Sequence, residues 1–404
     1  MSLKVPFNAV MVRIAIILLV LLGGSAAHAG WELQSPIPTV SQLRAIWGTS
    51  ESDVFAVGDY GAIIHYDGNS WSPMNSGISV NIYGVWGTSD NNVYAAADKS
   101  ATGTGTILHY DGNTWKTQAS STQRLRDVWG ISETDIFIVG ENGTILHYDG
   151  EVWNKMSSPP NTPTLQAVWG ASRDNVFAVG GPSGTGGIGA GTVIHFDGNI
   201  WNTVNIGTVD RLHDIWGTAE NDIFIVGESG TILHYDGSSW TSMESGTTDT
   251  LRDVCGSAAD DVFAVGDYGT IVHYDGQKWT TMNNASSTRL HGVWVASEKD
   301  VFASGEMGTI LHYDGKDDGD NGDCPFTAVL GKGNPQLKTL RQVRDEVLRK
   351  NAAGKTLISI YYNYGGVLTA LFEKQPTVKQ FAKIFLEVLL PAIQNSLAYL
   401  KSNH

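Results

Sequence analysis

Short apolar stretches alternate with Gly, Asp, Asn and Ser through most of the chain, in a pattern that repeats about every 40 residues. The repeat around residue 140 shows the pattern clearly. Its apolar runs are Leu125–Trp129, Asp135–Val139 and Thr144–Tyr148, and a fourth run begins near Trp153. Runs of this length, rich in β-branched and aromatic residues and bounded by turn residues, are typical of strands. Each repeat therefore predicts four antiparallel strands, which is one blade of a β-propeller.

Seven copies of the repeat fill residues 31–315, and two anchors mark each copy. The first anchor, Val-Trp-Gly in most copies, lies at Trp47, Trp86, Trp129, Trp169, Trp216, Cys255 and Trp294. The second, His-Tyr-Asp-Gly in most copies, begins at His65, His109, His147, His195, His234, His273 and His312. The Asp-Gly pair predicts a two-residue hairpin turn with positive φ at both positions.

The seventh copy ends at Gly315 without the tryptophan that opens a fourth strand. The segment that begins at Trp31 resembles such a fourth strand, but it precedes the first repeat and follows no first, second or third strand. We therefore predict an all-β fold, a seven-bladed β-propeller over residues 30–315 that is closed by the N-terminal strand. Closure of this kind removes the open sheet edges that promote aggregation.

The first 29 residues have the features of a secretory signal peptide. Lys4 and Arg13 precede a short apolar run from Ile14 to Leu22, and Ala27-His28-Ala29 provides a small-residue cleavage site. The apolar run is too short to span a bilayer. We expect cleavage after Ala29 and export from a bacterium to the periplasm, the outer surface or the medium.

The chain changes character after the propeller. Residues 316–323 form an acidic Asp/Gly linker, and residues 324–404 are expected to form a small all-α C-terminal domain of three helices. The third helix, from about Thr377 to Leu400, is compatible with packing on the other two or with peripheral contact at a membrane interface, and packing is favoured. The charge also changes: residues 31–315 hold 12 basic and 33 acidic residues, whereas residues 316–404 hold 12 basic and 8 acidic ones.

The net charge of −15 argues against a nucleic-acid partner, because phosphate binding requires basic surface. The recurrent tryptophans are best explained by packing between blades, and exposed rings that stack on sugars are the alternative. The recurrent histidines occur once per blade, which favours half-buried strand positions over a shared metal site. We expect no metal and no cofactor.

Polar residues at one predicted face are the candidate ligand site. Acids at the turn between the second and third strands lie at Asp59, Glu141, Glu228, Asp267 and Glu306. Bases near the start of the first strand lie at Arg44, Arg126 and Arg252. Structural salt bridges are the favoured interpretation and a polar ligand face is the alternative. Insertions at 98–105 and 180–191 fall on the same predicted face, where propellers often carry recognition loops.

The repeats resemble those of exported bacterial β-propellers of the BNR/Asp-box-like group. The resemblance rests on units such as Val128-Trp129-Gly130 followed by His147-Tyr148-Asp149-Gly150. A histidine stands two residues before the aspartate, where an Asp-box has serine, and the arginine triad and tyrosine nucleophile of sialidases are not found.

The C-terminal segment resembles the CFI-box domain of exported bacterial proteins. The resemblance rests on Cys324 after the linker, on Leu340-Arg341, Arg344-Asp345, Leu348, Asn351 and Gly354, and on Tyr361-Tyr362. Here Cys-Pro-Phe replaces Cys-Phe-Ile. The resemblance implies a sorting or surface-processing role, with Cys324 as an attachment point or reactive thiol, and a packed cysteine is the alternative.

The repeated blades favour a non-catalytic binding protein over an enzyme, because catalysis needs an asymmetric set of groups that these similar blades do not supply. We expect a monomeric propeller that uses one face to bind a glycan, a cell-wall polymer or a protein, with the C-terminal domain localising it. A structural propeller subunit of an envelope assembly is the alternative. A glycoside hydrolase or lyase is the least favoured.

Overall fold

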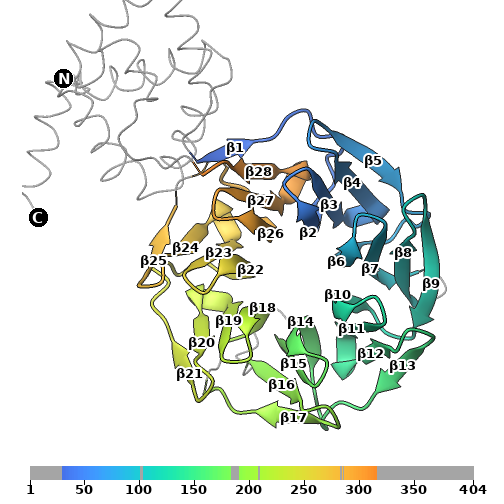
Figure 1. Cartoon of the computed structure of the whole chain (residues 1–404), viewed down its shortest axis with the longest axis vertical. Helices are drawn as coiled ribbons and strands as arrows, with labels where there is room; N and C mark the ends of the chain where they lie inside the picture. The colour runs from blue at the N-terminus through green and yellow to red at the C-terminus, as the bar shows by residue number, and fades with distance from the viewer. Residues whose placement is uncertain are drawn as a thin grey trace, which may run out of the picture. The chain divides into compact units, whose positions relative to one another are not determined.

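The computed structural model describes residues 30–315, apart from 101–102, 183–190, 208–209, 283 and 285. In these residues, 28 strands form seven four-stranded sheets that surround a central axis (Figure 1). The predicted seven-bladed propeller is confirmed. The predicted signal peptide, the linker and the helical C-terminal domain with Cys324 lie outside the described residues.

Each blade runs outward from the axis in four antiparallel strands. The first, innermost strands are β2 (Leu43–Ser50), β6 (Ile82–Ser89), β10 (Leu125–Ser132), β14 (Thr164–Ser172), β18 (Leu212–Ala219), β22 (Leu251–Ala258) and β26 (Leu290–Ser297). The second strands are β3 (Asp53–Gly58), β7 (Asn92–Lys99), β11 (Asp135–Gly140), β15 (Asn175–Gly181), β19 (Asp222–Gly227), β23 (Asp261–Gly266) and β27 (Asp300–Gly305).

The outer half of each blade is shorter. The third strands are β4 (Ala62–Tyr66), β8 (Gly105–Tyr110), β12 (Ile145–Tyr148), β16 (Thr192–Phe196), β20 (Ile232–Tyr235), β24 (Ile271–Tyr274) and β28 (Ile310–Tyr313). The outer strands are β5 (Trp71–Asn75), β9 (Trp115–Ser121), β13 (Trp153–Met156), β17 (Trp201–Val204), β21 (Trp240–Ser242), β25 (Trp279–Thr281) and β1 (Trp31–Leu33). Short 3-10 turns are η1 (Asp59–Gly61), η2 (Glu141–Gly143), η3 (Glu228–Gly230), η4 (Asp267–Gly269) and η5 (Glu306–Gly308).

The hydrophobic core lies between neighbouring blades. Phe55 on β3 is 1% exposed and meets Tyr110 and Trp115 of the next blade at ring-centroid distances of 5.9 and 6.3 Å. The equivalent contact recurs around the ring, for example from Phe137 to Trp201. Burial of these aromatic rings between sheets is a large hydrophobic contribution to stability, so the recurrent outer tryptophans are packing residues.

The N-terminal strand closes the ring. The seventh sheet has the order β1-β28-β27-β26, so the first strand of the chain is the outer strand of the last blade (Figure 1). Trp31 is fully buried there. The predicted closure is confirmed, and it joins the two ends of the repeat array within one sheet.

The two-residue hairpin predicted at Asp-Gly is wrong. Tyr148 pairs with Trp153, which leaves a loop of four residues, and within that loop only Gly150 has a positive φ, of 94°. The Oδ1 atom of Asp149 accepts the backbone N–H groups of Glu151 and Val152 at 3.0 and 2.9 Å. The aspartate side chain therefore closes the loop, as in an Asx turn, and only the glycine needs the left-handed conformation.

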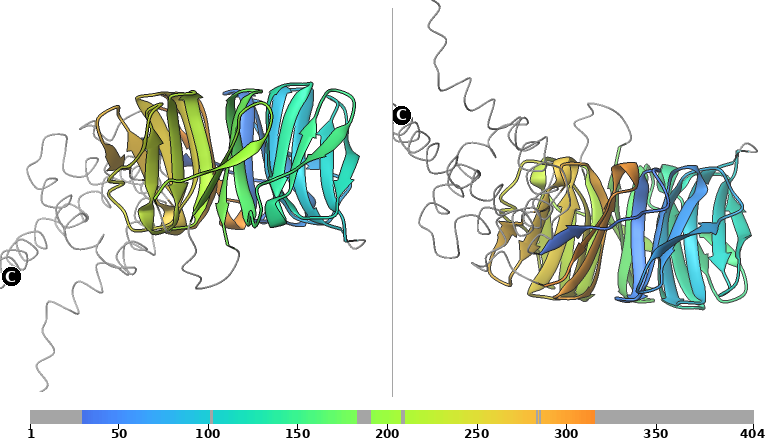
Figure 2. Two further views of the ribbon diagram at one scale, coloured as in Figure 1. Left: turned by 90° about the horizontal axis from the view of Figure 1, so that it is seen from below. Right: turned by 90° about the horizontal axis from the view of Figure 1, so that it is seen from above.

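The propeller has two distinct faces, which Figure 2 shows edge-on. We call one the loop face; it carries the 3-10 turns, the connections between second and third strands in blades two and four, and the connections between blades. We call the other the turn face; it carries the Asp-Gly loops and the turns between first and second strands. This division follows from the alternating strand directions in each sheet, and it decides which residues can share a site.

Candidate functional site

The turn face is built from one set of contacts that recurs in every blade. The strand histidine bonds to the first residue of the second strand, as from His65 Nε2 to Asp53 Oδ1 at 2.6 Å. The same pairs join His109, His147, His195, His234, His273 and His312 to Asn92, Asp135, Asn175, Asp222, Asp261 and Asp300. This regularity assigns the histidines to blade structure. Among the described residues, no group of three or more His, Cys, Asp or Glu is arranged to hold a metal ion.

The loop face brings the predicted bases together around the axis. Each inner strand has a register shift near its start, for example between Leu43 and Ala45, and Arg44 occupies that bulge. Tyr83 holds the equivalent position on β6. The guanidinium carbons of Arg44 and Arg126 lie 4.9 and 4.6 Å from its ring centroid, so Tyr83 contacts the bases of both neighbouring blades.

The predicted acids pair with these bases in some blades and not in others. Arg44 forms an ion pair with Asp59, and Arg252 binds both carboxylate oxygens of Asp267 at 2.5 and 3.2 Å. In contrast, the closest approach of Arg126 to Glu141 is 3.5 Å. The two remaining predicted acids have other partners: Glu228 lies 3.9 Å from His213, and Glu306 pairs with Arg289.

Sequence reasoning missed a second set of arginines, each one residue before an inner strand. They are Arg124, Arg211 and Arg289, and a repeated Arg-Leu dipeptide is the signal that could have revealed them. Arg289 bridges the acids of two successive blades, Asp267 at 2.7 Å and Glu306 at 2.9 Å. Arg124 bridges Asp98 at 2.6 Å and Glu141 at 3.1 Å. These ion pairs connect neighbouring blades on the loop face.

Blades three to five interrupt this network. Four buried side-chain nitrogens there have no hydrogen-bond partner among the described residues: Arg126 Nε, Gln166 Nε2, Arg211 Nε and His213 Nε2. Burial and the nearby guanidinium groups lower the pKa of His213 to about 3, so its imidazole is neutral at neutral pH. Buried polar atoms usually have hydrogen-bond partners. The four unpartnered nitrogens are therefore the most unusual polar feature of the loop face.

Three aspartates follow the bases on the inner strands. Asp127, Asp214 and Asp253 each accept the backbone N–H of the next blade, those of Val168, Val254 and Val293, at 2.9, 2.8 and 2.6 Å. Burial and the neighbouring Asp214 raise the pKa of Asp127 to about 8. A hydrogen bond joins the carboxyls of Asp214 and Asp253, whose pKa values are also raised by burial. The oxygens of these buried carboxyls therefore link neighbouring blades near the axis by accepting backbone N–H groups.

Asp127→Asn is expected to make the protein less sensitive to alkaline pH. A raised pKa means that the folded state binds a proton that the unfolded state releases near pH 4, so wild-type stability falls as pH rises from about 4 to about 8. Asparagine keeps an oxygen for the Val168 N–H and does not ionise. Urea unfolding at pH 5 and pH 8.5 checks this. The variant should gain stability relative to wild type at the higher pH; an equal difference at both values would contradict it.

Exposed apolar side chains occur on the loop face of three successive blades, six, seven and one. We call Val40, Tyr60, Tyr268 and Met307 the apolar arc; they are 88, 78, 69 and 69% exposed. The last three occupy the middle of η1, η4 and η5 with φ of 58, 59 and 55°. Left-handed backbone is uncommon for residues other than Gly, Asn and Asp, and bulky side chains there are outliers. The equivalent positions in blades three and five hold Asn142 and Ser229.

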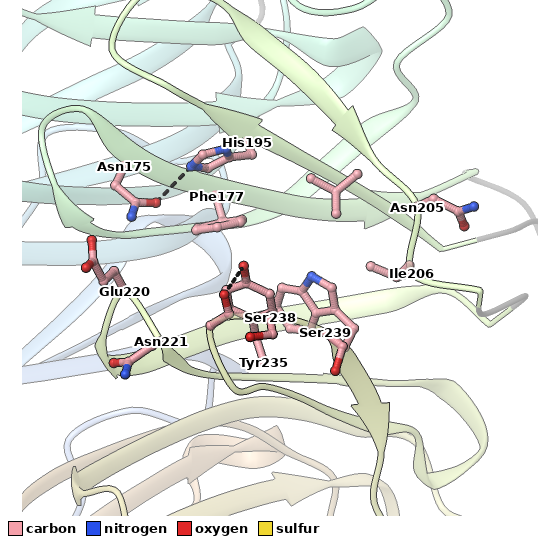
Figure 3. A pocket seen from close by; sticks show the side chains of 13 residues that line it. Asn175, Phe177, His195, Asn205, Ile206, Glu220, Asn221, Tyr235, Ser238 and Ser239 are labelled. Carbon is pink, nitrogen blue, oxygen red and sulfur yellow. Dashed lines mark hydrogen bonds between the residues drawn. The ribbon is translucent and has the colours of Figure 1, made fainter.

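A separate groove of about 680 Å³ opens between blades four and five (Figure 3). Glu220 and Asn221 lie on one side of it and Asn205 and Ile206 on the other. A difference in side-chain length accounts for the opening. The third residue after the outer tryptophan is methionine or glutamine in the other blades, whereas blade four has the shorter Val204, which lines the groove with Trp240.

Comparison with solved structures shows the fold. The structure of YCF48 bound to D1 peptide matches with a TM-score of 0.56 and 16% identity, over 72% of this chain and 97% of that chain. YCF48 from Cyanidioschyzon merolae matches with a TM-score of 0.57 and 16% identity, over 72% of this chain and 100% of that chain. The WD40 propeller domain of Doa1 matches with a TM-score of 0.57 and 10% identity, over 71% of this chain and 97% of that chain.

No family model and no curated protein matches the chain. The Asp-box and CFI-box resemblances therefore stay predictions from the sequence. In the described part of the chain, no helix has the length and apolar character needed to cross a membrane.

Proposed function

We propose that the protein is a non-catalytic binding protein that holds a segment of another protein on its loop face. The observation that carries the proposal is the apolar arc. Three of its four side chains, those of Tyr60, Tyr268 and Met307, occupy left-handed positions where a small polar residue fits better, and the arc exposes apolar groups to solvent on three adjacent blades. The turn face, by contrast, repeats one set of structural contacts in all blades.

The composition of the loop face favours a protein ligand over a glycan. Tyrosine rings can stack on sugars, but Met307 and Val40 offer only apolar contact. Tyrosine, methionine and arginine are enriched in protein interfaces. Here the apolar arc lies on the same face as the arginines at the starts of the inner strands. One structural neighbour, YCF48, has a structure bound to D1 peptide, which supports the same class of ligand for this fold.

Export belongs to the same proposal. Cleavage after Ala29 leaves a chain that begins with Gly30 and Trp31, so the strand that closes the ring is kept whole. A binding propeller delivered outside the cytoplasm, with its C-terminal segment as a localisation or attachment domain, accounts for the order of segments along the chain.

Replacing Tyr60 and Tyr268 by asparagine tests the role of the apolar arc. Asparagine, present at the equivalent position of blade three, suits the left-handed backbone, so stability should stay the same or rise by up to about 1 kcal/mol. Binding should fall strongly, because exposed tyrosines supply much of the energy of protein interfaces. A photoreactive residue placed at Met307 of the full chain in cells, followed by mass spectrometry, should yield one cross-linked protein that the double variant loses.

The matched control uses exposed apolar residues of the turn face. Val152 and Ile200 are 55 and 60% exposed on the Asp-Gly loops, and their replacement by serine should leave the cross-link intact. Equal loss in both pairs of variants, or cross-linking to polysaccharide in place of protein, would contradict the proposal.

A further inference from the structure

The ring of acids on the loop face is broken at blade four. The residue after the second-strand glycine, which is Ala97 in blade two, is Asp59, Asp98, Glu141, Glu228, Asp267 or Glu306 in six blades, and Gly181 in blade four. The insertion that follows does not replace the lost carboxylate, because the sequence has no Asp or Glu between Asp174 and Asp197. One carboxylate position out of seven is therefore missing from the sequence itself.

Arg211 faces this missing position. It occupies the same place as Arg124 and Arg289, which bridge the acids of the blades before and after them. The preceding blade of Arg211 is blade four, where a Cβ added to Gly181 would lie 3.1 Å from its Cγ. The backbone oxygen of Arg211 accepts the N–H of Glu228 at 2.9 Å, but no hydrogen bond or ion pair joins its side chain to another described residue, and the buried Nε has no hydrogen-bond partner. The loss of the acid removes the equivalent of one of the two carboxylates that Arg124 and Arg289 bridge. The other carboxylate, Glu228, attracts Arg211 but forms no ion pair with it.

Neighbouring donors converge on the same sector. Arg126 is left with the 3.5 Å contact to Glu141, because Arg124 binds that carboxylate more closely, at 3.1 Å. Gln166 on β14 and His213 on β18, the inner strands of blades four and five, hold buried nitrogens without hydrogen-bond partners. Burial lowers the pKa of both Arg126 and Arg211; the charge of Arg211 lowers that of Arg126 further, and Glu228 partly offsets the effect of burial at Arg211. Two desolvated cations without adequate counter-charge favour an anion between them.

We propose that Arg126, Gln166, Arg211 and His213 form a binding site for one carboxylate group, brought by the protein segment that docks on the loop face. The site takes a carboxylate because six other blades place an Asp or Glu at the position that blade four leaves open. A side-chain or C-terminal carboxylate of the ligand completes the ring. This inference rests on the proposed function, since it names one chemical group of that ligand.

Calorimetric titration of the full chain with an acetylated, amidated tri-glutamate peptide at low salt tests the site. Wild type should bind this peptide and should not bind the tri-glutamine analogue. Arg211→Gln and Arg126→Gln should each weaken binding about 10-fold or more, as expected for loss of a charge-assisted hydrogen bond. Gly181→Asp should abolish binding while keeping or raising the unfolding midpoint, because it supplies the missing carboxylate from within the chain.

Arg289→Gln is the matched control, because Arg289 holds the same position as Arg211 but has both of its acids. It should leave peptide binding within about two-fold of wild type, the scatter expected between distant sites. No binding by wild type, equal loss in Arg289→Gln, or full binding by Gly181→Asp would each overturn the inference.

Two further measurements are needed. One distinguishes a polypeptide carboxylate from a polysaccharide carboxylate, and the other tests the proposed function independently of the carboxylate site. Tighter binding of polygalacturonate than of the peptide, with the same dependence on Arg211, would overturn assignment to a polypeptide. The cross-link at Met307 reports partner docking on the apolar arc independently. Suppose that the Met307 cross-link persists in Arg211→Gln and that the wild type does not bind tri-glutamate. The carboxylate site would then be wrong, and the proposed binding face would still be supported.

Discussion

Trp31→Ala is expected to lower the free energy of unfolding by about 3–5 kcal/mol, the range for deletion of a fully buried large aromatic side chain. Trp31 is 0% exposed and lies on β1, the outer strand of the last blade. The residue contributes more than its own packing, because β1 comes from the beginning of the chain and pairs with β28 near the end of the array. Loosening it exposes the edge of β28 and opens the ring.

Urea unfolding of the full chain measures this effect. Trp240→Ala is the matched control, because Trp240 holds the same position in blade five, is partly exposed beside the groove, and lies within a continuous stretch of chain. Its replacement should cost clearly less and should leave the ring closed. A loss for Trp31→Ala no larger than that of Trp240→Ala would show that closure does not depend on β1.

The parts of the fold that every blade shares could be predicted from the sequence. The recurrent tryptophans and His-Tyr-Asp-Gly segments each make the same contact in each blade, so their spacing alone indicates strands, turns and ring closure. The Asp-Gly loop was predicted wrongly because the dipeptide does not show that the Asp149 side chain closes the loop.

The candidate site depends on differences between blades, and much of it could not be predicted. The exposure of Tyr60 and its positive φ follow from the 3-10 turn, whose geometry the hydrophobic pattern does not encode. Arg211 lacks the partner from the preceding blade because Gly181 stands where other blades have an acid, and it forms no ion pair with Glu228 of its own blade. Sequence analysis found the ring of acids and bases but could not show which members lack partners, because that requires contacts across blades.

Substitutions at Cys255 and Val295 are expected to have strongly non-additive effects on the free energy of unfolding. The other blades have a tryptophan at the position of Cys255 and, in the next blade, a glycine at the position of Val295. Elsewhere the tip of each inner-strand tryptophan lies against the glycine of the next blade. A Cβ on Gly130 or Gly256 would lie 2.6 Å from Cη2 of Trp86 or Trp216. Blade six has Cys255 in place of the tryptophan, and blade seven has Val295 in place of the glycine. The smaller residue on one strand thus makes room for the larger residue on the next.

Cys255→Trp alone should destabilise the protein by about 1–3 kcal/mol or more, because the indole would overlap the Val295 side chain. Val295→Gly alone should also cost about 1–3 kcal/mol, because it leaves a cavity beside a small residue and frees the backbone of a strand. The double variant restores the arrangement of the other blades and should recover most of both losses, a coupling above about 1.5 kcal/mol.

Urea unfolding of the four proteins in this cycle measures the coupling directly. The Cys255 thiol has a pKa raised to about 12 by burial, so it stays protonated and its replacement removes no charge. The cycle therefore reports packing alone. Additive losses in the double variant would mean that the inner tryptophans and the facing glycines are not packed against each other, and that the ring is held by the outer contacts between blades.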